Sequence, residues 1–223
     1  MLRAICQREG CRVHEVVGFI VDRMREDSVS QQIRTIRQLN ESHLHEHALV
    51  ECQRMQWWER VLVCPDHLRT AQETDSAAHT KALAMFGCLV ADARSRPLCG
   101  QWDYKKEIEV KFDNSQTIEF CSIGCREGVT FYYDIWANIH FGYLGMCGGF
   151  DEDILLEGAT IEHSVSNLGQ SRDDPSDQVA IRIGVSLYRS ALTEGSLMRQ
   201  LYEHRYELNK ARSNDQGAFE VYR

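Results

Sequence analysis

The chain has 223 residues, a formal net charge of −8 and 43% apolar residues. These values fit a globular protein with a buried core and exclude a disordered or collagen-like chain. No run of residues approaches the ~18 apolar positions that cross a bilayer, and the first residues lack the apolar stretch of a secretory signal. We therefore expect neither membrane insertion nor export by the general secretory pathway.

The negative charge is concentrated in one part of the chain. Between Pro97 and Ser190 there are 7 Lys and Arg against 15 Asp and Glu, so this stretch carries the whole excess. An acidic surface repels phosphate backbones unless a basic patch overrides it. The charge distribution thus disfavours nucleic acid as a partner of this region.

The first 95 residues read as helical. Apolar residues recur at helical spacing over 12–26, and a second helical run opens at Ser30. Asn40 to Ser42 can break that run, Pro65 closes it, and the polar segment 69–79 is expected to be a linker. A further helix is predicted over 78–93.

The pattern changes after residue 100. Alternating apolar residues on either side of a turn at 113–116 predict a β-hairpin over 108–120. Residues 129–145 fit either a helix or an irregular aromatic segment, and later helices are predicted over 152–164, 175–192 and 194–211. The expected fold class is α+β, mostly α-helical with one small β-hairpin.

Cysteine and histidine spacing predicts no metal site. The nine cysteines lack the paired CxxC spacing of structural zinc sites, so we expect reduced, mostly buried thiols. Cys121 and Cys125 could pair in an oxidising compartment. His43 and His47 lie one helical turn apart, but no third ligand is evident nearby, and a solvated helix face is the expected structure.

Three motifs in the middle of the chain combine carboxylates with aromatic residues. They read WDYK at 102–105, ANIHFGYLG at 137–145 and DDPSDQ at 173–178. A carboxyl group beside Trp and Tyr can have its pKa raised enough to act as a general acid at neutral pH. A second, better solvated carboxylate can then serve as base or nucleophile, as in glycoside hydrolysis.

The three motifs, in this order, resemble the bacterial polymorphic toxin type 44 family over about residues 80–192. One departure is Ala137, where the family more often has Gly. The resemblance implies a toxin made in the bacterial cytoplasm, secreted by a specialised machine into competing cells and neutralised by a cognate immunity protein. We accordingly expect residues 1–80 to be a helical delivery or adaptor segment and residues 81–223 to be the toxin catalytic domain.

Each candidate residue also has a structural interpretation. Asp103 can cap a turn, and Asp174 can be the N-cap of the following helix. Asp134 and Asn138 would share one face of a helix and could bond each other. His140 lies roughly 240° around an ideal helix from Asp134, so the two cannot both face one site if this segment is helical.

The leading hypothesis is a hydrolase that cleaves the glycan of peptidoglycan in the periplasm, with Asp103 and Asp134 as the acid and base pair and no cofactor. The first alternative is a ribonuclease or metal-assisted nuclease acting in the cytoplasm, with Mg²⁺ on Asp103, Asp174 and Asp177; the family has been regarded as probable RNases. The second is a non-enzymatic helical interaction module. The predicted catalytic residues are Asp103, Asp134, His140 and Asp177, and the predicted substrate-binding residues are Trp102, Lys105, Asn138, Tyr143 and Asp174.

Overall fold

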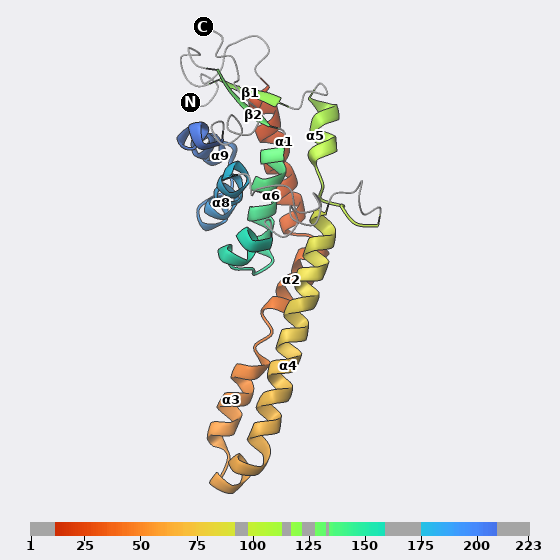
Figure 1. Ribbon diagram of the computed structural model, residues 1–223, viewed down its shortest axis with the longest axis vertical. Helices are drawn as coiled ribbons and strands as arrows, with labels where there is room; N and C mark the ends of the chain where they lie inside the picture. Colours follow the sequence, from red (N-terminus) through yellow and green to blue (C-terminus); the bar gives the residue numbers. More distant parts are fainter. Residues whose placement is uncertain are drawn as a thin grey trace. The chain divides into compact units, whose positions relative to one another are not determined.

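The structure is a computed structural model that describes residues 12–91, 98–112, 117–121, 128–132, 134–158 and 175–208. The described chain is mostly helical, as predicted (Figure 1). It divides into two compact units. We call them the larger unit, Met1–Val29 with Trp102–Arg223, and the inserted unit, Ser30–Gln101. The predicted division after residue 80 differs from this one, because residue 80 lies inside a long helix of the inserted unit.

Helix α1 (Val13–Ser28) contributes the first part of the core of the larger unit. Its apolar residues recur every three or four positions and therefore share one face. Val13, Val16, Ile20 and Met24 on that face are fully buried. The helix contacts α6 (Asp134–Cys147) and α9 (Glu194–Glu203). The N-terminal helix thus belongs to the same core as the motif-bearing segments.

Helices α6 and α8 (Pro175–Arg189) form the tightest helix pair of the molecule. A Cβ atom at Gly142 would overlap the backbone carbonyl of Ile181, and one at Gly184 would overlap that of Ile139. Contacts along the two helices advance in the same direction, so the helices run parallel and their N-termini lie at the same end of the pair. Helix α6 ends at Cys147, and two residues later Gly149 adopts a φ of 82°, which suits glycine.

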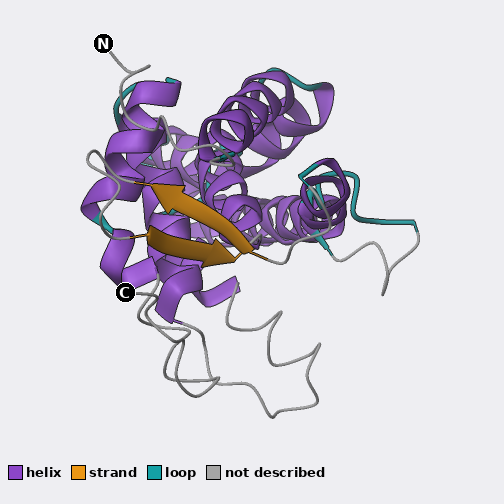
Figure 2. Ribbon diagram, turned by 90° about the horizontal axis from the view of Figure 1, so that it is seen from above, coloured by secondary structure: helices purple, strands orange, loops and turns teal. Residues whose placement is uncertain are grey.

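The predicted hairpin over 108–120 is wrong in its first strand, because Lys105–Lys111 forms helix α5. A strand would place Ile108, Val110 and Phe112 on one face, yet Ile108 and Phe112 are buried while Val110 is 64% exposed. That is the spacing of a helix. Strand β1 (Thr117–Cys121) instead pairs antiparallel with β2 (Gly128–Tyr132), as Figure 2 shows from above.

The inserted unit packs two short helices, α2 (Gln31–Asn40) and α3 (Leu44–Arg54), against α4 (Trp57–Val90). The side chain of Ser30 caps α2 by accepting the N–H of Ile33. The break that follows is fixed by Asp75 of α4, whose carboxylate accepts the Ser42 hydroxyl and two backbone N–H groups that open α3. The predicted break near residues 40–42 is therefore correct.

Helix α4 continues through two predicted interruptions. Pro65 lies inside it, and the predicted linker 69–79 is helical. Cys64, Ala71, Ala82 and Phe86 are buried along the helix, and this packing offsets the backbone hydrogen bond that a proline cannot make. In the described ranges, α4 included, no helix combines the length and apolarity needed to cross a membrane.

Two disulfides lie in the inserted unit, so the prediction of reduced thiols is wrong for four cysteines. Cys52 of α3 is bonded to Cys64 of α4, and Cys88 is bonded to Cys99. Helix packing brings each pair together, which sequence spacing alone does not reveal. Cys147 is buried and takes part in neither of these disulfides. The possible Cys121–Cys125 pair involves Cys125, which lies outside the described residues.

Candidate functional site

One face of α6 holds a buried polar cluster centred on Asp27 of α1. The Tyr104 hydroxyl donates to Asp27 Oδ2 at 2.8 Å, and His140 Nε2 lies 2.9 Å from the same oxygen. The rings of Trp102 and Tyr104 meet the imidazole edge-on. We call Asp27, Tyr104 and His140 the Asp27 cluster; it joins α1, α6 and the start of α5.

Burial sets the protonation of this cluster. It lowers the pKa of His140, and the nearby Asp27 carboxylate only partly opposes the effect. It also raises the pKa of the Tyr104 phenol, with the hydrogen bond to Asp27 adding to the rise. At neutral pH the imidazole is therefore uncharged and the phenol keeps its proton, so both groups can donate to the Asp27 carboxylate.

The rings at the Asp27 cluster are too buried to stack on a sugar. His140 is 1% exposed and Trp102 is 3% exposed, so neither ring presents a surface on which a sugar could stack. The arrangement fits a structural tie between three elements. Asp27 was absent from the predicted site. It lies three residues after Met24 and so continues the buried face of α1. An acidic residue on such a face indicates that a hydrogen-bond donor lies nearby in the interior.

Asp103 and Lys105 lie at the beginning of α5. The Asp103 carboxylate accepts the backbone N–H of Lys105 at 3.3 Å, which is the capping role that the sequence left open. Both side chains are half-buried. Asp103 is flanked by Trp102 and Tyr104, which pack on the His140 face of α6.

A second polar group lies on another face of α6, where the N-termini of α6 and α8 meet. Asp134 begins α6, and Asn138 follows one turn later on the same face. Asn138 Nδ2 donates to Asp177 Oδ1 at 2.7 Å. Asp177 lies in the first turn of α8 and is 3% exposed, whereas Asp134 and Asn138 are half-buried. We call these three residues the paired-helix site.

The structure thus divides the predicted residues between two faces of α6. The segment is a regular helix, so Asp134 and His140 do not share a site, as the helical geometry required. Asn138 and Asp177 come together through a hydrogen bond, and Asp134 lies one turn before Asn138 on the same face of α6. Asp174, which the sequence placed beside Asp177, lies outside the described residues.

Tyr143 follows both groups along α6. Burial raises the pKa of its phenol to about 12, with a contribution from Cys147. Its ring meets Tyr188 of α8 edge-on. At neutral pH it is therefore an uncharged O–H group that packs between helices.

The described ranges contain no group of three or more His, Cys, Asp or Glu side chains placed to hold a metal ion. His43 is exposed at the N-cap of α3, and His47 is exposed within that helix. The Mg²⁺ of the nuclease alternative remains a prediction, since it involves Asp174.

These observations define a class of protein: a mostly helical domain in which carboxylates lie in the first turns of two parallel helices. Residues 98–190 match the family described as bacterial toxin 44, which confirms for this part of the chain the resemblance seen in its motifs. This segment is therefore similar to a bacterial toxin domain. Searches of curated proteins and of solved structures returned no match. The matched segment includes α5, α6 and α8 but neither α1 nor Asp27.

Proposed function

We propose that the chain is an antibacterial effector whose toxin domain hydrolyses the glycan strands of peptidoglycan at the paired-helix site. The observation that carries the proposal is the hydrogen bond between Asn138 and Asp177, with Asp134 one helical turn before Asn138 on the same face of α6. Two carboxyl groups flanking one bond are the recurring machinery of glycoside hydrolysis.

The two carboxyl groups have different surroundings, as acid and base catalysis requires. Asp177 is the more buried of the two and is oriented by the Asn138 amide, so it is assigned the role of proton donor to the leaving oxygen. Asp134 is better exposed to solvent and can stabilise the positive charge that develops at the anomeric carbon. In this proposal Asp177 replaces Asp103, because Asp103 caps α5.

Charge favours a glycan over a nucleic acid as the substrate. The stretch that bears the motifs carries the entire −8 of the chain, and Asp173 and Asp174 directly precede α8. A polyanionic RNA would be repelled unless a bound cation intervened. An uncharged sugar chain meets no such barrier.

Expression of the chain with and without an added export signal tests the compartment. We expect killing only by the exported form, and purified sacculi should release soluble fragments. Killing by the unexported form alone, with RNA degradation that EDTA stops, would favour the nuclease. Absence of killing in both compartments would favour the interaction module.

Substitution tests the residues. We expect Asp134→Asn and Asp177→Asn each to lower the rate of sacculus cleavage at least about 100-fold, the lower range for loss of an acid or base group. Asp153→Asn, an exposed acidic position outside the site, is the matched control and should retain full activity. Full activity in both site variants would contradict the assignment.

A further inference from the structure

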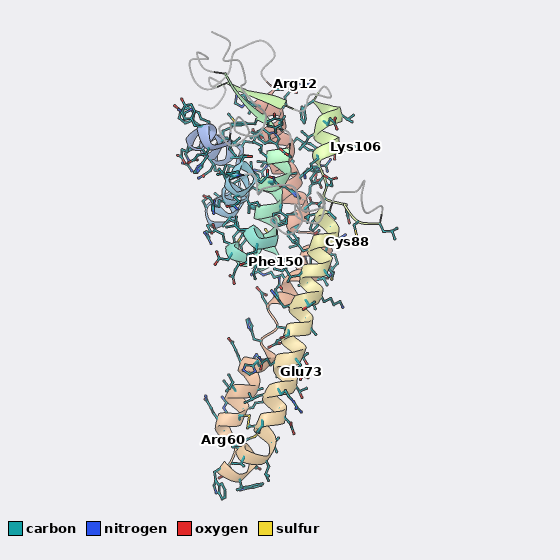
Figure 3. The ribbon with its side chains drawn as sticks, in the orientation of Figure 1. Arg12, Arg60, Glu73, Cys88, Lys106 and Phe150 are labelled. Carbon is teal, nitrogen blue, oxygen red and sulfur yellow. A yellow bond between two sulfur atoms is a disulfide. The ribbon has the colours of Figure 1, made fainter. Side chains whose placement is uncertain are left out.

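The inserted unit exposes large apolar side chains where α4 begins. Trp57 is 76% exposed, Leu62 73%, Val61 68% and Trp58 51%. These positions repeat at a spacing of four residues and therefore share one side of the helix. We call the four residues the tip patch; Arg60, labelled in Figure 3, lies in the same first turns of α4.

The tip patch is not needed to hold α3 against α4. Cys64 faces α3 through its disulfide with Cys52. Arg60 donates to the backbone carbonyls of Cys52 and Gln53 at the end of α3. None of these contacts uses a side chain of the tip patch. Its exposure therefore has no explanation in the packing of the described hairpin.

The size of the tip patch suits a protein interface. From their exposed fractions, the four residues expose on the order of 500 Å² of mostly apolar surface. That area is near the upper end of the sizes found for the largest apolar patch on a monomeric protein. A standard interface buries about 800 Å² per partner, somewhat over half of it apolar. The tip patch therefore supplies about the apolar area that one side of such an interface needs.

Charge favours a second copy of this chain as the partner. The inserted unit, 30–101, has eight Lys and Arg and eight Asp and Glu, whereas the rest of the chain carries −8. Around the tip patch, residues 51–69 contain three basic and three acidic residues. Two neutral surfaces can meet without repulsion, whereas a lipid-binding helix typically carries a cluster of Lys and Arg, which this segment lacks.

We propose that two copies of the chain associate through their tip patches in a symmetric dimer. In a two-fold interface the same patch serves both partners, so a self-complementary apolar surface suffices. Trp57 and Trp58 are the anchors, since tryptophan dominates the binding energy of many interfaces. The proposal is independent of the catalytic assignment.

Sedimentation of the full chain between about 1 and 100 µM tests the dimer. We expect a monomer–dimer equilibrium in which Trp57→Glu and Leu62→Glu each raise the dissociation constant at least about 30-fold, as loss of a central anchor does. Leu83→Glu is the control, because Leu83 is an exposed residue of the same helix outside the patch, and it should leave the equilibrium unchanged. Far-UV circular dichroism verifies that each variant is folded.

Tryptophan fluorescence gives a second readout, because Trp57 and Trp58 are exposed whereas Trp102 and Trp136 are buried. Dilution of the wild-type chain should shift the emission to longer wavelength, and Leu62→Glu should abolish the shift. A wild-type chain that stays monomeric at about 100 µM, or a dimer that survives both substitutions, overturns the proposal. Monomers that bind phosphatidylglycerol vesicles through the tip patch also overturn it, and assign the surface to lipid.

Discussion

Asp27 is the side chain on which the polar interior of the larger unit depends. Its Oδ2 atom meets both the Tyr104 hydroxyl and His140 Nε2, and its side chain is only 14% exposed. A buried carboxylate is costly unless donors surround it. Two donors from separate segments therefore fix the position of α1 relative to α5 and α6.

The buried imidazole makes stability depend on pH. Because burial lowers the pKa of His140 in the folded state below its ordinary value of about 6.5, the unfolded chain takes up the proton first. The contribution of the neutral His140 to the free energy of unfolding is therefore complete above about pH 6.5. It is lost as the pH falls from there toward the pKa of His140 in the folded state. We expect the free energy of unfolding to fall in this window with a slope of at most about 1.4 kcal/mol per pH unit from this group.

Chemical denaturation between about pH 7.5 and 4.5 measures this slope. His140→Gln keeps an N–H group that can reach Asp27 but cannot titrate, so its slope in the same window should be smaller than that of the wild type. Equal slopes in the two proteins would show that His140 does not control the acid sensitivity.

At the level of elements, the α6–α8 pair determines where the candidate carboxylates meet. Gly142 and Gly184 allow the backbones to approach, and this close contact holds the two N-termini at one end. The DDPSDQ motif supplies the start of α8, with Pro175 at the first helical position and Asp177 in the first turn. The geometry of the paired-helix site thus depends on residues that carry no functional group.

We expect Gly142→Ala to destabilise the protein by about 3 kcal/mol, because the new methyl group would overlap the Ile181 carbonyl and must push the helices apart. Gly18→Ala in α1 is the control, since a Cβ there would meet only the Glu194 side chain at ordinary contact distance. That change should stabilise the protein by up to about 1 kcal/mol through helix propensity. Urea denaturation measures both, and equal stabilities would contradict the close approach.

At the level of the whole molecule, the larger unit extends beyond the segment that matches the family. Helix α1 lies outside residues 98–190 yet contributes a fully buried face to the larger unit. The inserted unit separates α1 from Trp102 along the chain. The hydrogen bond between Asp27 and Tyr104 nevertheless holds the two sides of that insertion close together.

Two deletions test this organisation. A chain of residues 98–223 should fail to fold cooperatively, because loss of α1 removes several buried Val and Ile side chains worth about 2 kcal/mol each from a domain of marginal stability. A chain in which a short Gly-Ser linker replaces residues 30–101 should keep a cooperative thermal transition. A folded 98–223 fragment would contradict the role assigned to α1.

The sequence determined much of this protein by local chemistry. Periodicity predicted α1, Ser30 and Pro175 predicted the starts of α2 and α8, and three motifs revealed the similarity to a toxin family that residues 98–190 match. These signals operate within one or two helical turns, so they can be read without a fold. The same reasoning showed that Asp134 and His140 would point in different directions on a helix.

Only the tertiary structure decided which residues meet. The disulfide partners, the continuation of α4 through Pro65 and the helical form of α5 all depend on burial against distant segments. The pairing of Asp177 with Asn138 also depends on such packing. The same is true of Asp27, which bonds Tyr104 across 77 residues of sequence. Long-range packing can override local preference, because the free energy of burying an apolar face exceeds the differences in propensity between helix and strand.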